Sequence, residues 1–183
     1  GKTCDAVAYA HSKGIIHRDL KPANIMIGEF GEVLVMDWGI AKILSQTEKA
    51  PDSYPPTGTT EGTRYGTVMG TPSFMAPEQA EGRLDAINER TDIYSLGAIL
   101  YNILALRPPI TGSSADAEVM ERIKTGRITP PTQRAQDSRD TNVLLHCPDH
   151  QVPEALSAVA MQALALEPDG RYADVHSLQR DVS

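Results

Sequence analysis

Residues 16–39 read IHRDLKPANIMIGEFGEVLVMDWG, and this stretch decides how the rest of the chain is interpreted. It contains three short signals in fixed order: HRD at 17–19, KPAN at 21–24 and DWG at 37–39. Between the second and third signals, two apolar runs flank the sequence GEFG, a pattern that predicts a β-hairpin. A tight hairpin would bring Asn24 and Asp37, at the outer ends of its strands, close together.

The side chains at the ends of this predicted hairpin suit a divalent cation. Asn24 and Asp37 both offer oxygen atoms, and Mg²⁺ prefers oxygen ligands together with shared phosphates. Asp19 lies five residues before Asn24 on a predicted loop. From there its carboxylate could accept a proton from a hydroxyl that faces a metal-held phosphate.

These three signals resemble the catalytic loop and the metal-binding turn of protein kinases, in the serine/threonine version with a lysine two residues after the aspartate. The family has phenylalanine where this chain has Trp38. Because both side chains are aromatic and fill an apolar slot, we expect Asp37 to keep its role as a metal ligand. The resemblance implies ATP as the phosphoryl donor, Mg²⁺ as the cation with Mn²⁺ as a substitute, and a protein as the substrate.

The resemblance also implies a role for each matched residue. Asp19 would orient and deprotonate the substrate hydroxyl, and Lys21 would stabilise the transferred phosphoryl group. Asn24 and Asp37 would hold the metal with its nucleotide, and Met26 would lie beneath the adenine. Thr71 would contact Asp19 and Lys21 and help to set the preference for serine or threonine hydroxyls. In this interpretation the catalytic loop is 16–24, the metal-binding turn 37–39 and the activation segment 37–78.

The activation segment is rich in proline, glycine and hydroxyl residues between 45 and 70, as expected of a loop with little to bury. It closes on GTPSFMAPE at 70–78. The resemblance implies that Glu78 pairs with Arg171 in a buried, bidentate contact. From the residues alone, two solvated charges are the simpler alternative.

Arg18, directly before Asp19, implies regulation by phosphorylation. In the family this arginine marks kinases that are switched by a phosphate on the activation segment. A phosphothreonine carries a charge of about −2 and would bond the guanidinium strongly. Thr63 and Thr67 are the nearest candidates before Thr71, although each could equally be an ordinary solvated loop residue.

Outside these motifs the chain reads as mostly helical. Helices are predicted at 3–13, 91–106, 115–125, 153–166 and 173–182, and a polar loop at 129–152. The helix at 91–106 is apolar on nearly every side and should be buried. The resemblance implies that its Asp92 holds the backbone of the catalytic loop, whereas helix capping is the alternative. The HCPDH sequence at 146–150 could ligate zinc, but a surface loop is favoured because no second ligand cluster exists.

Composition bounds the class of protein. The 183 residues fit one domain, 1–183, and the net charge of −7 without a basic block argues against nucleic-acid binding. No apolar run approaches the roughly 18 residues of a spanning helix. Two cysteines make no disulfide framework and favour a reducing compartment, so we expect a cytoplasmic location.

The predicted fold is α+β and mostly α-helical: the large, C-terminal lobe of a kinase with a small hairpin at the catalytic site and no N-terminal lobe. The sequence contains no glycine-rich phosphate loop and no strand lysine of the family type. We therefore expect a piece of a longer serine/threonine kinase that is inactive alone and self-associates through an apolar face around Ile25, Met26 and Met36. The alternatives are a pseudokinase that acts as an interaction module and a small-molecule phosphotransferase.

Overall fold

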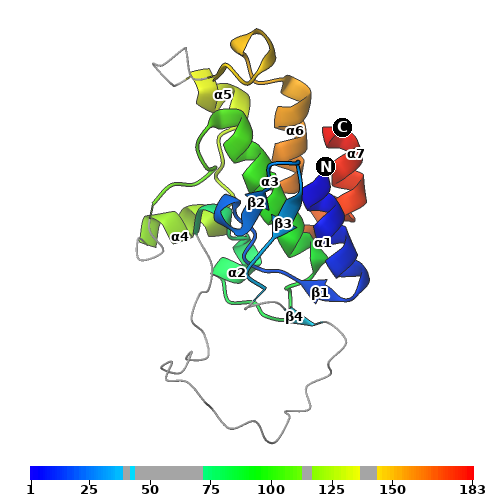
Figure 1. Ribbon diagram of the computed structural model, residues 1–183. Helices are drawn as coiled ribbons and strands as arrows, with labels where there is room; N and C mark the ends of the chain where they lie inside the picture. The colour runs from blue at the N-terminus through cyan, green and yellow to red at the C-terminus, as the bar shows by residue number, and fades with distance from the viewer. Residues whose placement is uncertain (39–41, 44–71, 113–116, 137–143) are drawn as a thin grey trace, which may run out of the picture.

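The computed structural model describes residues 1–38, 42–43, 72–112, 117–136 and 144–183 (Figure 1). The described part is mostly helical. Its α-helices are α1 (Lys2–Ser12), α2 (Pro77–Ala80), α3 (Glu89–Ala105), α4 (Ala117–Lys124), α5 (Pro131–Gln136), α6 (Glu154–Ala163) and α7 (Val175–Val182).

Two small antiparallel sheets complete the described part. Strand β1 (Ile15–Ile16) pairs with β4 (Lys42–Ile43), and β2 (Ile25–Ile27) pairs with β3 (Val33–Val35). The second pair is the predicted hairpin, with Ile25 opposite Val35 and Ile27 opposite Val33. Its turn closes through a hydrogen bond from the Gly28 amide to the Glu32 carbonyl, 2.8 Å long.

Helix α3 forms the centre of the helical body, with α1 and α7 side by side next to it (Figure 1). Its start is capped because the Asn88 side chain accepts a hydrogen bond from the Arg90 amide. Most of its residues are buried, as predicted for a helix that is apolar on nearly every side. Its buried Ile93 and Leu96 pack with residues of α1, α6 and α7 in one core cluster.

Helices α3 and α6 pack closely at one point. A Cβ atom placed on Gly97 of α3 would lie 2.5 Å from the Cβ of Ala163 and 3.3 Å from its carbonyl carbon. Only a residue without a side chain allows this approach, because non-bonded carbon atoms pack at about 3.5–4.0 Å. The glycine therefore sets the distance between the two helices.

The structure corrects several predicted boundaries. The stretch 129–152, predicted as a loop, contains α5 and a short 3-10 turn at Pro148–His150. Pro131 is the first residue of α5, a position where proline is compatible with a helix. Helix α6 ends at Ala163 and not at 166, and the predicted helix 115–125 is α4, described from Ala117 to Lys124.

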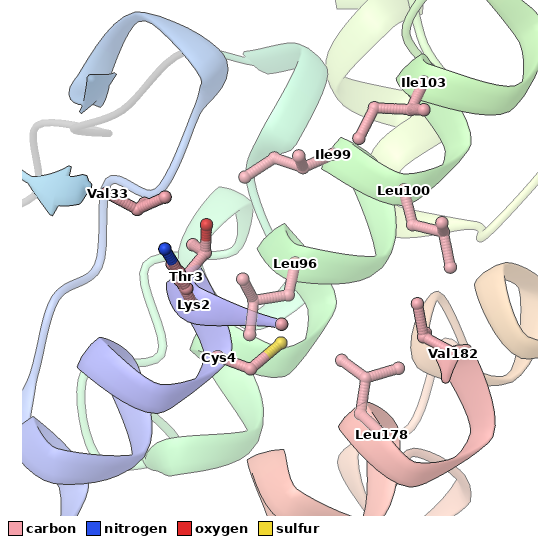
Figure 2. Close-up of a pocket in the computed structure, with 11 residues that line it drawn as sticks. Lys2, Thr3, Cys4, Val33, Leu96, Ile99, Leu100, Ile103, Leu178 and Val182 are labelled. Atoms are coloured by element: carbon pink, nitrogen blue, oxygen red, sulfur yellow. The ribbon is translucent and has the colours of Figure 1, made fainter. Parts of the chain in front are cut away.

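An apolar groove of about 280 Å³ opens where the start of α1 meets α3 and α7 (Figure 2). Ile99, Leu100 and Ile103 of α3 line one side, and Leu178 and Val182 of α7 line another.

Among the described residues, no helix combines the length and the apolar character that are needed to cross a membrane.

Candidate active site

The backbone before Asp19 is fixed by a buried carboxylate on α3. Asp92 is fully buried, and its two oxygens accept hydrogen bonds from the amides of His17 (2.8 Å) and Arg18 (2.9 Å). His11 on α1 adds a contact of 2.8 Å from its Nε2 to Asp92 Oδ2. The prediction that Asp92 holds this loop is confirmed, whereas the contribution of His11 was not predicted.

Arg18 has a backbone conformation that non-glycine residues rarely adopt. Its φ is 73°, in the left-handed region. The Gln79 side chain donates a 2.8 Å hydrogen bond to the Arg18 carbonyl and thereby joins α2 to this loop. Within the described residues, the buried Nε atom of Arg18 has no hydrogen-bond partner. Burial lowers the pKa of this guanidinium, although the charge of Asp92 opposes the shift.

Asp19, Lys21 and Asn24 form one polar cluster. Lys21 Nζ lies 2.6 Å from Asp19 Oδ2, and Asn24 Nδ2 donates to the Asp19 carbonyl (2.9 Å) and to Oδ2 (3.3 Å). The short 3-10 turn at Pro22–Asn24 returns the chain so that Asn24, which is itself buried, reaches back to Asp19. Three of the predicted site residues therefore lie together.

The hairpin brings Asp37 to the same end of the sheet as Asn24. The Met36 amide donates a 2.8 Å hydrogen bond to the Asn24 carbonyl, which continues the pairing of β2 and β3 by one step. Asp37 follows with an exposed side chain and a φ of 62°, again in the left-handed region. The predicted proximity of Asn24 and Asp37 is thus confirmed at the level of the backbone.

His17 joins the two halves of the site. It is fully buried; its Nδ1 accepts from the Asp19 amide (3.2 Å), and its Nε2 lies 2.9 Å from the Met36 carbonyl. Since Nδ1 acts as the acceptor, Nε2 carries the proton and donates to the carbonyl. The imidazole also contacts the Trp38 ring in a tilted arrangement, with a centroid distance of 4.5 Å and an interplanar angle of 55°. His17 thus connects the loop before Asp19 with the end of the hairpin.

Glu78 and Arg171 form the predicted pair. Their side chains are fully buried, and two N–O contacts of 2.8 Å make the pair bidentate. Thr91 Oγ1 also donates to Glu78 Oε1, and the Tyr94 ring lies 5.0 Å from the guanidinium carbon. The alternative of two solvated charges is wrong.

The described residues bring no further predicted site residue into the polar cluster around Asp19. Met26 is on β2 with 53% of its surface exposed. Thr71, Gly39, and the candidate phosphorylation sites Thr63 and Thr67 lie outside the described residues. Among the described residues, no three histidine, cysteine, aspartate or glutamate side chains are arranged to hold a metal, and the sequence at 146–150 is no exception. Within that sequence, His146 Nε2 lies 3.3 Å from Cys147 Sγ.

A family comparison decides what this arrangement represents. The model of the protein kinase domain matches residues 1–181. The chain belongs to the protein kinase family. The kinase resemblance of residues 16–39 is therefore confirmed, and the described structure is a mostly helical kinase domain with small two-stranded sheets.

Curated kinases from bacteria resemble the chain along almost its whole length. It is 41% identical over 183 residues to serine/threonine-protein kinase PknD of Protochlamydia amoebophila, and 38% identical over 185 residues to PknD of Chlamydia felis. It is 36% identical over 179 residues to serine/threonine-protein kinase PknB of Mycolicibacterium smegmatis. The alignments cover 98%, 99% and 98% of this chain but only 17%, 18% and 24% of the three relatives.

Proposed function

We propose that the protein transfers the γ-phosphoryl group of ATP to serine or threonine hydroxyls of other proteins. The observation that carries this proposal is the contact of Asp19 with Lys21 and Asn24, beside the hairpin end that bears Asp37. The relatives named as serine/threonine-protein kinases support the same activity. We infer further that residues 1–183 form the large lobe of the kinase domain and act in the cytoplasm, where ATP is available.

Asp19 is the proposed base. Its carboxylate would accept the proton of the substrate hydroxyl as the oxygen attacks the γ-phosphorus, while the bond from that phosphorus to the β-γ bridging oxygen breaks. Asn24 Nδ2 donates to the backbone carbonyl and to Oδ2 of Asp19, and these two bonds keep the carboxylate oriented. Lys21 Nζ, 2.6 Å from Oδ2, would contribute positive charge to the transferred group. Proton transfer of this kind contributes about 10²–10⁴-fold to a rate.

Asn24 and Asp37 are the proposed ligands of Mg²⁺, or of Mn²⁺ in its place. The Asn24 amide nitrogen is directed at Asp19, which leaves the amide oxygen as the atom available to a cation. The exposed Asp37 carboxylate offers further oxygens. This donor set fits a hard cation that also binds phosphates. When bound, the cation would neutralise charge on the ATP phosphates, and Met26 would contact the adenine.

The activation segment is proposed to span 37–78, with Thr71 contacting Asp19 and Lys21. Arg18 supports a phosphorylation switch, because its buried Nε lacks a partner within the described residues. A phosphate on Thr63 or Thr67 would supply that partner and join the segment to the loop that carries Asp19. Phosphosite mapping of active protein, together with a Thr63→Ala, Thr67→Ala variant, tests this part. Full activity in the variant and no phosphate on either residue would contradict it.

Self-association through the hairpin is also proposed. Ile25 and Met36 are half-buried, and the more exposed apolar side chains of the hairpin are Ile27 (75%), Phe30 (90%) and Leu34 (60%). Exposed apolar side chains on both faces of the hairpin, Ile27 on one and Leu34 on the other, would favour association. Light scattering of residues 1–183 should show species larger than a monomer, and an Ile27→Ser, Leu34→Ser variant should lower their fraction. A monomer at high concentration would contradict this part.

The experiment for the main proposal is a phosphorylation assay on the purified full-length protein. It would be incubated with Mg-ATP, with peptides that contain serine, threonine or tyrosine, and separately with small alcohols. We expect phosphoserine and phosphothreonine, and little transfer by residues 1–183 alone. Transfer only to small alcohols would favour a small-molecule phosphotransferase. Absence of any transfer by the full-length protein would favour an interaction module that retains the fold.

A further inference from the structure

Trp38 makes a hydrogen bond that an aromatic hydrocarbon side chain cannot make. Its indole Nε1 donates to the Val35 carbonyl at 2.9 Å, three residues back in the chain. The half-buried ring also contacts His17, with a centroid distance of 4.5 Å. The first contact reaches the end of β3, two residues before Asp37, and the second reaches the loop that precedes Asp19.

The Val35 carbonyl is available because of the pairing of the hairpin. In an antiparallel pair, opposite residues alternate between hydrogen-bonded and non-hydrogen-bonded positions. Met36 donates to the Asn24 carbonyl, and Gly28 donates to the Glu32 carbonyl, so these steps are the hydrogen-bonded ones. Val35 lies opposite Ile25, between two such steps. Its carbonyl therefore points away from β2, and the indole N–H satisfies it.

The neighbouring backbone groups are also occupied. The Met36 amide is bound by Asn24, and the Met36 carbonyl accepts from His17 Nε2 at 2.9 Å. Asp37 then adopts a φ of 62°, a left-handed conformation that is unfavourable for a residue with a Cβ atom. The hydrogen bond from the Trp38 indole to the Val35 carbonyl closes the turn 35–38, which contains Asp37.

We propose that Trp38 is a positioning residue: its indole N–H holds the turn 35–38, and with it the Asp37 carboxylate, in one arrangement before nucleotide and metal bind. The phenylalanine found at this position in the family pattern would keep an aromatic ring beside His17 but would leave the Val35 carbonyl without this donor. The turn of this chain is therefore held by one hydrogen bond that the same turn with phenylalanine would lack. The effect on catalysis rests on the proposed role of Asp37 as a metal ligand, whereas the effect on the turn does not.

A spectroscopic test needs no activity. Trp38 is the only tryptophan of the 183 residues, so a proton–nitrogen NMR spectrum contains a single indole N–H signal. We expect this proton to exchange with D₂O at least about tenfold more slowly than that of a free indole, as a hydrogen-bonded and half-buried group should. We also expect Trp38→Phe to speed exchange of the Met36 amide, which donates to the Asn24 carbonyl within the same turn. The control, Tyr9→Phe, removes a hydroxyl from an exposed side chain of α1 and should leave that exchange unchanged.

A second substitution separates the donor from the ring. Replacing the single tryptophan with benzothienylalanine keeps the bicyclic shape but replaces the N–H with sulfur. It should speed exchange of the Met36 amide as Trp38→Phe does, even if phenylalanine disturbs the packing. Free exchange of the indole proton, or unchanged exchange of the Met36 amide in both variants, would overturn the proposal.

The kinetic test uses the full-length protein. Trp38→Phe should raise the Mg²⁺ concentration for half-maximal rate by about three- to tenfold, the range expected for one lost hydrogen bond, and should leave KM for the protein substrate unchanged. An unchanged Mg²⁺ requirement in an active variant would overturn the catalytic part. If the wild type shows no transfer, the proposed function fails, and the exchange measurements alone decide whether the indole holds the turn.

Discussion

Arg171 and Glu78, 93 positions apart in the chain, form a buried bidentate ion pair with both N–O contacts at 2.8 Å. The remaining guanidinium donors are also used, by the carbonyls of Ala165, Leu166 and Arg90. The pair therefore joins α2, the start of α3 and the chain between α6 and α7. Gln79, the residue after Glu78, donates a hydrogen bond to the Arg18 carbonyl. The ion pair is therefore also connected with the loop that carries Asp19.

Removing one partner should be strongly destabilising. Arg171→Ala would leave the Glu78 carboxylate buried without its counter-charge, and breaking such pairs costs about 3–5 kcal/mol. Urea denaturation of residues 1–183 would measure the change in the free energy of unfolding. The control is Arg83→Ala, which breaks the exposed pair with Glu81 and should cost no more than about 1 kcal/mol. Equal effects of the two substitutions would contradict the buried role of Arg171.

The same pair predicts how stability depends on pH. Burial acts to raise the pKa of Glu78, but the hydrogen bonds and charge of Arg171 outweigh it and hold the pKa below its ordinary value of 4.5. The folded state then binds fewer protons than the unfolded state, so the contribution of Glu78 is complete above pH 4.5 and is lost as the pH falls through the folded pKa. Unfolding free energies measured between neutral and acid pH should fall more steeply below this point in the wild type than in Glu78→Gln. Parallel curves would refute the assignment.

Gly97→Ala should destabilise the domain although alanine favours helices. The gain in helix propensity is about 1 kcal/mol, whereas overpacking costs about 1–3 kcal/mol, and here part of the contact is with the backbone of Ala163. Ala163→Gly in the same molecule would remove the Cβ that is met at 2.5 Å. Thermal or urea unfolding should therefore show a favourable coupling between the two substitutions. Strict additivity would mean that the helices do not meet at these residues.

Asp92→Asn should lower the rate of phosphoryl transfer by the full-length protein while the domain stays folded. Asparagine retains one oxygen but loses the charge and one acceptor for the His17 and Arg18 amides. Exchange of these two amides with D₂O should become faster, as measured by NMR on residues 1–183. Glu89→Gln, in the first turn of the same helix, serves as the control and should change neither quantity. A normal rate in Asp92→Asn would show that the loop does not depend on this carboxylate.

Sequence patterns predicted those features that depend on short-range order. The alternation of apolar runs and a turn predicted the hairpin, and its two ends meet through the Met36 amide and the Asn24 carbonyl. The all-round apolar character of 91–106 predicted a buried helix, which the structure describes as Glu89–Ala105. The Glu78–Arg171 contact came from the family resemblance alone, because no local pattern relates residues so far apart in the chain.

Other features have no signal in the local sequence pattern. The prolines at 130 and 131 favour a loop, whereas Pro131 begins helix α5, because proline is compatible with the first turn of a helix. The apolar pattern of 3–13 predicts a helix but says nothing about the polar contact of His11 with Asp92. The aromatic character that tryptophan shares with phenylalanine does not indicate the hydrogen bond that the Trp38 indole donates.

The most direct test of the proposed function is the rate of γ-phosphoryl transfer by the full-length protein with Asp19→Asn. Asparagine nearly preserves the shape of the side chain that contacts Lys21 and Asn24, but it cannot accept the hydroxyl proton. Asp85→Asn, which changes an exposed aspartate, is the control for loss of charge. We predict that kcat falls by at least about 10²-fold in Asp19→Asn and is unchanged in Asp85→Asn. A folded Asp19→Asn protein that transfers phosphate at the wild-type rate would contradict the account.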